Sequence, residues 1–297
     1  MDGVPGVQQC PIAPGGNFTY RFRADLYGTS WFHSHYSSQY VSGVVGAMVF
    51  HGPQNYDYDI DMGPVFLTDN YHTDYFQIIQ ELMTPNEGIS VGAGTSDNNL
   101  INGKNNFDCS TIRTPNPCKS NAGISKFNFQ PGKVHRLRII NAGAEAMQHF
   151  SIDGHTMDII AADFVPMVKS THRTIPLGIG QRYDVLVYGS GKPGESYWMR
   201  STIQPCSGAK NPNALAAVYY PNADQNTAPT TQAWPDDISP CEDLDASYLS
   251  PFYPQTPQTP AESHDIEIHF GVNASGNWLW TMNGVSYRAD YMNQPSS

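Results

Sequence analysis

The sequence has few charged residues and no cluster of basic ones. Only 14% of its 297 residues are Asp, Glu, Lys or Arg, and 27 acidic against 16 basic residues give a formal net charge of −11. Such a chain lacks the basic patch that binds nucleic acid or an anionic membrane surface. It also lacks an apolar run of about 20 residues, the length that a transmembrane helix needs. We therefore expect neither nucleic acid nor a membrane as a partner.

Paired cysteine motifs are missing as well. The five cysteines form no Cys-x-x-Cys pair, and none has a histidine beside it in the sequence. This argues against zinc-ribbon and thioredoxin-like motifs. Cys109 and Cys118 are close enough in the chain to pair with each other across an insert rich in Asn and Pro.

Two glycosylation sequons favour a secreted protein. They begin at Asn17 (Asn-Phe-Thr) and Asn273 (Asn-Ala-Ser). An odd number of cysteines in a secreted chain leaves one thiol without an obvious partner. Residues 1–6 have neither the basic start nor the apolar core of a signal peptide. From the secreted character without a signal, we expect the natural N-terminus to lie upstream.

The abundant residues are typical of β-structure. The chain contains 26 Gly, 23 Pro and 17 Tyr, and this composition with low charge favours a turn-rich, all-β fold over a helical bundle. One helical pattern occurs at residues 74–83, where Phe76, Ile79 and Met83 recur at helical spacing. Residues 86–88, Asn-Glu-Gly, are expected to end it.

The strand patterns divide the chain into four segments. Residues 1–55 read as the second half of a β-domain, and residues 63–221 as a complete β-sandwich with six or more strands. Residues 222–262 are rich in proline and predict an extended connector. Residues 263–297 contain one hairpin's worth of chain, which is too little to bury a core.

Particular strands follow from the alternation of apolar and polar residues. Residues 18–24 predict a strand whose apolar stripe, Phe18, Tyr20 and Phe22, lies in the core. Within the sandwich, residues 127–141 and residues 149–161 each predict a hairpin around a glycine turn.

Two histidines, His33 and His35, lie two residues apart in an aromatic stretch just before an apolar run at residues 44–50. On an extended chain their side chains share one face and lie roughly 6.5–7 Å apart along the strand. That spacing suits ligands of two neighbouring metal ions better than chelation of one ion. The alternative is a His-x-His that occurs by chance. The other eight histidines lack ligand spacing and read as surface or hydrogen-bonded sheet residues.

Two longer motifs resemble the first domain of fungal laccases, and the similarity is greatest to the ascomycete members. One of the motifs contains this histidine pair, and the other lies at the start of the chain. They are Gly28-Thr29-Ser30-Trp31-Phe32-His33-Ser34-His35-Tyr36 and Met1-Asp2-Gly3-Val4-Pro5-Gly6-Val7-Gln8-Gln9-Cys10-Pro11-Ile12. Leu100-Ile101-Asn102-Gly103-Lys104 and Gly180-Gln181-Arg182-Tyr183-Asp184-Val185 resemble the second domain, and Trp278-Leu279-Trp280-Thr281-Met282-Asn283-Gly284 resembles the start of the third. The resemblance implies cupredoxin-like Greek-key sandwiches: part of a first domain, a complete second and the start of a third.

The resemblance also implies a function. Laccases are secreted multicopper oxidases that oxidise phenols or aromatic amines and reduce dioxygen to water, and imidazole and thiolate ligands suit copper. His33 and His35 match the family pair that supplies one ligand to each type 3 copper. Glu145 loosely matches a carboxylate that receives the proton of the phenol, with an ordinary solvated loop glutamate as the alternative.

The cysteines fit the same family. Cys206 and Cys241, 35 residues apart, match a disulfide of ascomycete laccases. Cys10 resembles a cysteine that bridges to the far C-terminus, and its alternative is a small buried free thiol.

Three of the four copper motifs of the family are absent from this sequence. It contains the His-Ser-His, but no His-Trp-His-Gly, no His-Pro pair and no cysteine flanked by histidines. Two neutral imidazoles cannot close even one tetrahedral site. We therefore expect an internal segment of a laccase that is inactive by itself. The alternative is a degenerate cupredoxin-like module that serves binding or structure without catalysis.

Overall fold

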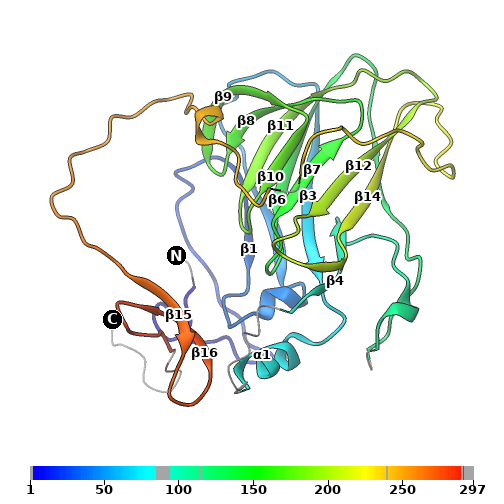
Figure 1. Cartoon of the computed structure of the whole chain (residues 1–297). Helices are drawn as coiled ribbons and strands as arrows, with labels where there is room; N and C mark the ends of the chain where they lie inside the picture. The colour runs from blue at the N-terminus through cyan, green and yellow to red at the C-terminus, as the bar shows by residue number, and fades with distance from the viewer. Residues whose placement is uncertain (1–2, 85–93, 114–115, 239, 289, 291–297) are drawn as a thin grey trace.

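The computed structural model describes residues 3–84, 94–113, 116–238, 240–288 and 290. Its main body is a sandwich of two β-sheets (Figure 1). The five-stranded sheet has the order β10 (Thr174–Leu177), β7 (Gln148–Ile152), β12 (Ser196–Ile203), β14 (Asn213–Tyr219), β5 (Ser125–Asn128). The seven-stranded sheet has the order β13 (Ala209–Asn211), β4 (Ser96–Ile101), β3 (Ile60–Asn70), β6 (Val134–Asn141), β11 (Arg182–Tyr188), β8 (Met157–Ala162), β9 (Val165–His172). The all-β prediction and the sandwich are confirmed.

The core lies between the two sheets and follows from the two-residue period of each strand. Leu137 and Ile139 on β6 point inward and are fully buried, as are Phe150 on β7 and Met199 on β12. The intervening residues of β6 point to the outer face of the seven-stranded sheet. Arg138 on that face is also buried, so this sheet is covered on both sides.

The outer cover is a hairpin of β1 (Gly28–His33) and β2 (Val45–Phe50). Thr29 on β1 is fully buried, its hydroxyl accepts a hydrogen bond from Arg138 Nη1 at 2.9 Å, and its carbonyl accepts one from Arg182 Nε at 3.0 Å. Arg138 also contacts the carboxylates of Asp61 (2.6 Å) and Asp184 (3.1 Å). These contacts attach the hairpin to the sandwich.

Two predicted hairpins are wrong in their pairing. β5 and β6 lie in opposite sheets, because β5 runs parallel to β14 while β6 lies between β3 and β11. β7 and β8 also lie in opposite sheets, so the turn that begins at Asp153 crosses the sandwich instead of closing a hairpin. Apolar alternation places a side chain toward the core equally well from either sheet, and it does not identify the partner strand.

The strand predicted at residues 18–24 is also wrong. This segment has no regular structure, and Phe18, Tyr20 and Phe22 are 51%, 45% and 60% exposed rather than in the core. Alternation alone does not form a strand, which needs a neighbour to pair its backbone groups. Among the described residues no strand pairs with this segment, although the ring of Phe22 contacts Phe50 at the end of β2.

The helical prediction is confirmed. α1 (Tyr75–Met83) begins after Asp74, whose side chain accepts the N–H of Phe76 at 2.9 Å as a capping residue. The stop expected at residues 86–88 lies outside the described residues. Short 3₁₀ turns are η1 (Gln39–Ser42), η2 (Cys109–Thr111) and η3 (Ala246–Tyr248). In the described part of the chain, no helix is long and apolar enough to cross a membrane.

The described part of the proline-rich segment at residues 222–262 has little regular structure, and its first part packs on the sandwich. Trp234 Nε1 donates to Ile152 O at 2.9 Å, and Ser250 O accepts the N–H of Val168 on β9 at 2.8 Å. Beyond Tyr253, whose hydroxyl donates to Asn55 Oδ1 at 2.9 Å, the chain runs away from the sandwich to the hairpin of β15 (Ile268–Val272) and β16 (Trp278–Met282). This hairpin lies apart from the sandwich (Figure 1).

The Arg138 contacts give a stability prediction. We expect Arg138→Leu to lower the free energy of unfolding by about 3–5 kcal/mol, because it leaves the buried Asp184 carboxylate with less compensation. Arg173→Leu is the matched control: its ion pair with Asp236 is half exposed, and we expect a loss of about 0–1 kcal/mol. Urea unfolding monitored by circular dichroism measures both. Equal losses would contradict the role assigned to Arg138.

Candidate copper and proton-transfer site

The two candidate copper ligands lie side by side. β1 ends at His33, and the His33 and His35 rings stack with centroids 5.8 Å apart and planes 26° apart. Both rings therefore lie on one side of the chain, although His35 follows the strand rather than belonging to it. The N–H of Ser34 between them donates to Val44 O at 3.0 Å and closes the loop that carries the pair.

The surroundings of His33 fix its orientation. Its ring packs on Trp31 (centroids 4.3 Å apart) and against the edge of Tyr40 (5.3 Å). Its Nδ1 lies 3.0 Å from Ser34 O. A carbonyl can only accept, so Nδ1 carries the proton in this contact and Nε2 keeps the lone pair that a metal requires.

The donor set fits copper as part of a centre. Two imidazoles side by side can each give one nitrogen to a separate ion, and imidazole is a suitable copper ligand. Among the described residues, no group of three or more His, Cys, Asp or Glu is placed to hold a metal ion. A complete tetrahedral copper site around either ring therefore needs further ligands besides His33 and His35.

Buried histidines elsewhere in the sandwich already have structural partners. His135 stacks on Phe129, and its Nε2 accepts the N–H of Gln130 at 2.9 Å. His155 Nε2 lies 2.7 Å from the hydroxyl of Tyr220. Burial lowers the pKa of both rings, which keeps them neutral.

Glu145 lies in the loop between β6 and β7, and a second carboxylate, Asp69, lies at the end of β3. The backbone N–H of Glu145 donates to Asp69 Oδ2 at 2.9 Å. Partial burial and then the negative charge of Asp69 raise the pKa of Glu145 to about 7. Near neutral pH this carboxyl can therefore both accept and release a proton.

Tyr40 connects the histidine loop with the Glu145 loop. Its ring contacts His33, and its hydroxyl donates to the carbonyl of Ala144, the residue before Glu145, at 3.2 Å. Burial, and then the charge of Asp69, raises the pKa of Tyr40 and keeps its hydroxyl protonated. No motif in the sequence indicated Tyr40 or Asp69 as site residues. The available signal was a carboxylate at the end of a buried strand, Leu67-Thr68-Asp69.

The structure contains two disulfides, Cys109–Cys118 and Cys206–Cys241, with Cα atoms 5.9 and 6.0 Å apart. Cys10 is a free, exposed cysteine, so the buried-thiol alternative is wrong. The sequon residues Asn17 and Asn273 are both exposed.

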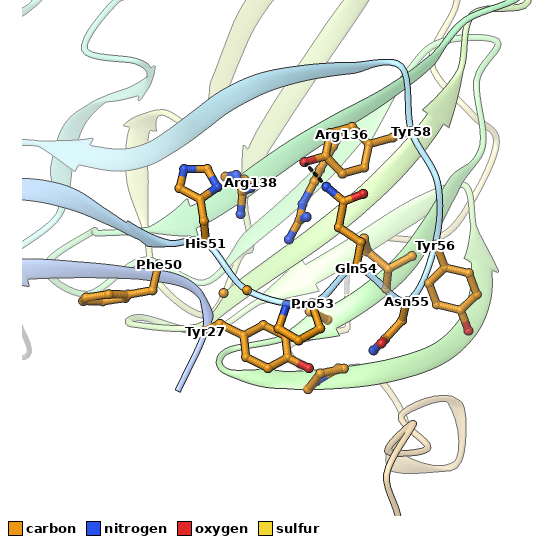
Figure 2. Close-up of a pocket in the computed structure, with 15 residues that line it drawn as sticks. Tyr27, Phe50, His51, Pro53, Gln54, Asn55, Tyr56, Tyr58, Arg136 and Arg138 are labelled. Carbon is orange, nitrogen blue, oxygen red and sulfur yellow. Dashed lines mark hydrogen bonds between the residues drawn. The ribbon is translucent and has the colours of Figure 1, made fainter. Parts of the chain in front are cut away.

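A separate cavity lies where the loop after β2 meets the outer face of the seven-stranded sheet (Figure 2). Its lining includes Tyr27, His51, Tyr58, Arg136 and Arg138, and none of the candidate site residues. Both arginines are already paired with carboxylates. We therefore read this cavity as the junction between the hairpin and the sandwich.

Comparison with known proteins identifies the family. The multicopper oxidase description matches residues 61–223, more than half of the chain, and a second multicopper oxidase description matches residues 1–55. The chain belongs to the multicopper oxidase family. Membership implies a copper cofactor.

Individual relatives include fungal laccases. "Oxidoreductase OpS5" of Beauveria bassiana is 37% identical over 296 residues, which cover 98% of this chain and 48% of that protein. The laccase of Cryphonectria parasitica is 37% identical over 302 residues, covering 98% and 47%. The crystal structure of a laccase from Botrytis aclada superimposes with a TM-score of 0.85 at 36% identity, covering 98% of this chain and 52% of that one. The cupredoxin-like fold is confirmed, and the chain spans about half the length of these relatives.

The raised pKa of Glu145 predicts how stability depends on pH. The fold favours the protonated form, so the contribution is present below about pH 4.5 and is lost as the pH rises through about 7. We expect the unfolding free energy of the wild type, relative to Glu145→Gln, to fall between pH 4.5 and 8. Urea unfolding at several pH values measures it. A difference that is constant or rises with pH would contradict the assignment.

Proposed function

We propose that this chain contributes part of the active centre of a laccase-type oxidase. In that reaction phenols or aromatic amines lose electrons and protons, and dioxygen takes up four of each to give two water molecules. The observation that carries the proposal is that Tyr40 links the imidazole pair to the loop of Glu145: its ring contacts His33, and its hydroxyl donates to the carbonyl of Ala144. In that loop, the pKa of the Glu145 carboxyl is raised to about 7. The relatives that bear the name laccase support the same reaction class.

His33 and His35 are the proposed type 3 ligands, one for each of two copper ions. The contact from His33 Nδ1 to Ser34 O orients the ring and leaves Nε2 for the metal. Trp31 and Tyr40 pack against the ring and restrict its rotation. Bound copper would supply one-electron redox chemistry toward dioxygen.

Glu145 is the proposed acceptor of the substrate proton. A phenol that loses an electron becomes strongly acidic, and a base in position avoids a charged radical intermediate by taking the proton. Because its pKa is about 7, the Glu145 carboxylate is a stronger base than an ordinary glutamate and is available at neutral pH.

We also propose that the protein is secreted. Two disulfides favour an oxidising compartment. Exposed sequons at Asn17 and Asn273 would allow glycosylation in the secretory pathway.

Copper binding tests the ligand pair. For the chain as written, we expect less than about one copper ion per molecule after dialysis, because two imidazoles leave a tetrahedral site open. Weak binding during Cu(II) titration, followed by electron paramagnetic resonance, should be lost in His33→Ala. His269→Ala is the control, since His269 lies on the separate hairpin and should not affect binding.

Two outcomes of this titration contradict the proposal. One copper ion per chain retained after dialysis would mean that other donors complete a site. Equal binding by the wild type and His33→Ala would mean that the pair is not the site. The second outcome would favour the cupredoxin-like module without catalysis.

Substrate chemistry tests Glu145 in copper-loaded, oxidase-active protein that carries this chain. We expect Glu145→Gln to lower kcat/KM for a phenol by about 100-fold, the low end of the range for a lost general base. It should leave oxidation of ferrocyanide, which has no proton to release, nearly unchanged. For the wild type, the phenol-to-ferrocyanide ratio should rise with pH through about 7 as Glu145 deprotonates. Equal loss with both donors would point to damage at the metal centre instead.

A further inference from the structure

The loop that carries Glu145 wraps around the carboxylate of Asp69. Three consecutive backbone N–H groups donate to it: Ala144 to Oδ1 at 2.6 Å, and Glu145 and Ala146 to Oδ2 at 2.9 and 3.0 Å. Asp69 is only 6% exposed. Successive N–H groups around one anion form a concave binding site, and hydrogen bonds to a charged acceptor are stronger than neutral ones.

The rest of the loop is fitted closely to this arrangement. A side chain at Gly143 would place its Cβ 3.2 Å from Asp69 Oδ1, so the glycine allows the backbone to approach the carboxylate. Ser207 holds the other side: its hydroxyl accepts the N–H of Met147 at 3.0 Å and donates to Glu145 O at 3.3 Å. Asp69 and Ser207 thus anchor the same loop, Asp69 through a charged carboxylate and Ser207 through an uncharged hydroxyl.

We propose that Asp69 is a positioning residue for Glu145: it fixes the backbone that carries the proton-accepting carboxyl and holds a negative charge beside it. This inference rests on the proposed role of Glu145 in proton transfer. The role differs from simple anchoring because the three N–H groups compensate the charge of Asp69 while leaving it close to Glu145. A like charge nearby disfavours ionisation of the second carboxyl, which retains its proton to higher pH.

The direct test reads Glu145 by nuclear magnetic resonance, without copper or substrate. The chain has seven glutamates, so selective ¹³C labelling of their carboxyl carbons gives few signals, and Glu145→Gln assigns the relevant one. In Asp69→Asn we expect the pKa of Glu145 to fall below about 7 but to stay above its ordinary value, because the like charge is lost while burial remains. The amides of residues 144–146 should exchange with solvent at least about 10-fold faster, since they lose charge-assisted hydrogen bonds.

Two control variants separate charge from anchoring. Ser207→Ala removes an uncharged anchor, so loop exchange should rise while the pKa of Glu145 stays near 7. Asp97→Asn removes another largely buried carboxylate, on β4, whose partners are Lys210 and His72 rather than the loop. It should change neither measurement.

The proposal is overturned if Asp69→Asn leaves the pKa of Glu145 unchanged, or if either control lowers it equally. If Asp69→Asn does not fold, hydrogen exchange of the loop amides in the wild-type protein tests the proposal instead. Slow exchange of the amides of residues 144–146 supports the proposal, and exchange as fast as that of solvent-exposed amides contradicts it. Failure of the proposed function is a separate result. In that case Glu145→Gln would oxidise phenol like the wild type, whether or not Asp69→Asn lowers the pKa of Glu145.

Discussion

The structure depends on one buried cation, Arg138, at the boundary between the β1–β2 hairpin and the sandwich. A guanidinium removed from water is tolerated only when charged and hydrogen-bonding partners surround it. Asp61 and Asp184 supply the charge from the sheet, and Thr29 supplies a hydroxyl from β1. Because β1 continues from Thr29 to His33, the contact that compensates the arginine also sets the position of the candidate copper ligands relative to the Glu145 loop.

The sequence predicted the β-sandwich, its approximate strands and α1, because these follow from local periodicity. It did not predict which strands pair. Residues 152–157 show why: a turn after Ile152 looks the same whether the next strand returns beside β7 or crosses to the other sheet, as β8 does. The error at Phe18 has a related cause, since a two-residue apolar period describes a strand only when a neighbour completes its hydrogen bonds.

The candidate site was predictable only where it is local in the chain. His33 and His35 are two residues apart, so the geometry of an extended chain is enough to place their side chains together. Asp69 and Tyr40 meet the Glu145 loop across about 75 and 104 residues of sequence. No local pattern indicates such contacts, because they arise from the order of strands in the sheet and from the docking of the hairpin.

The pairing of Asp69 with the Glu145 loop would resolve a physical conflict in the proposed proton transfer. A carboxyl that must accept a proton near neutral pH needs a raised pKa, and a neighbouring negative charge supplies this only if that charge is itself stabilised. Backbone N–H groups meet both demands, since they compensate Asp69 and belong to the peptide units that carry Glu145. The same three hydrogen bonds therefore hold the charge of Asp69 and the backbone that carries Glu145.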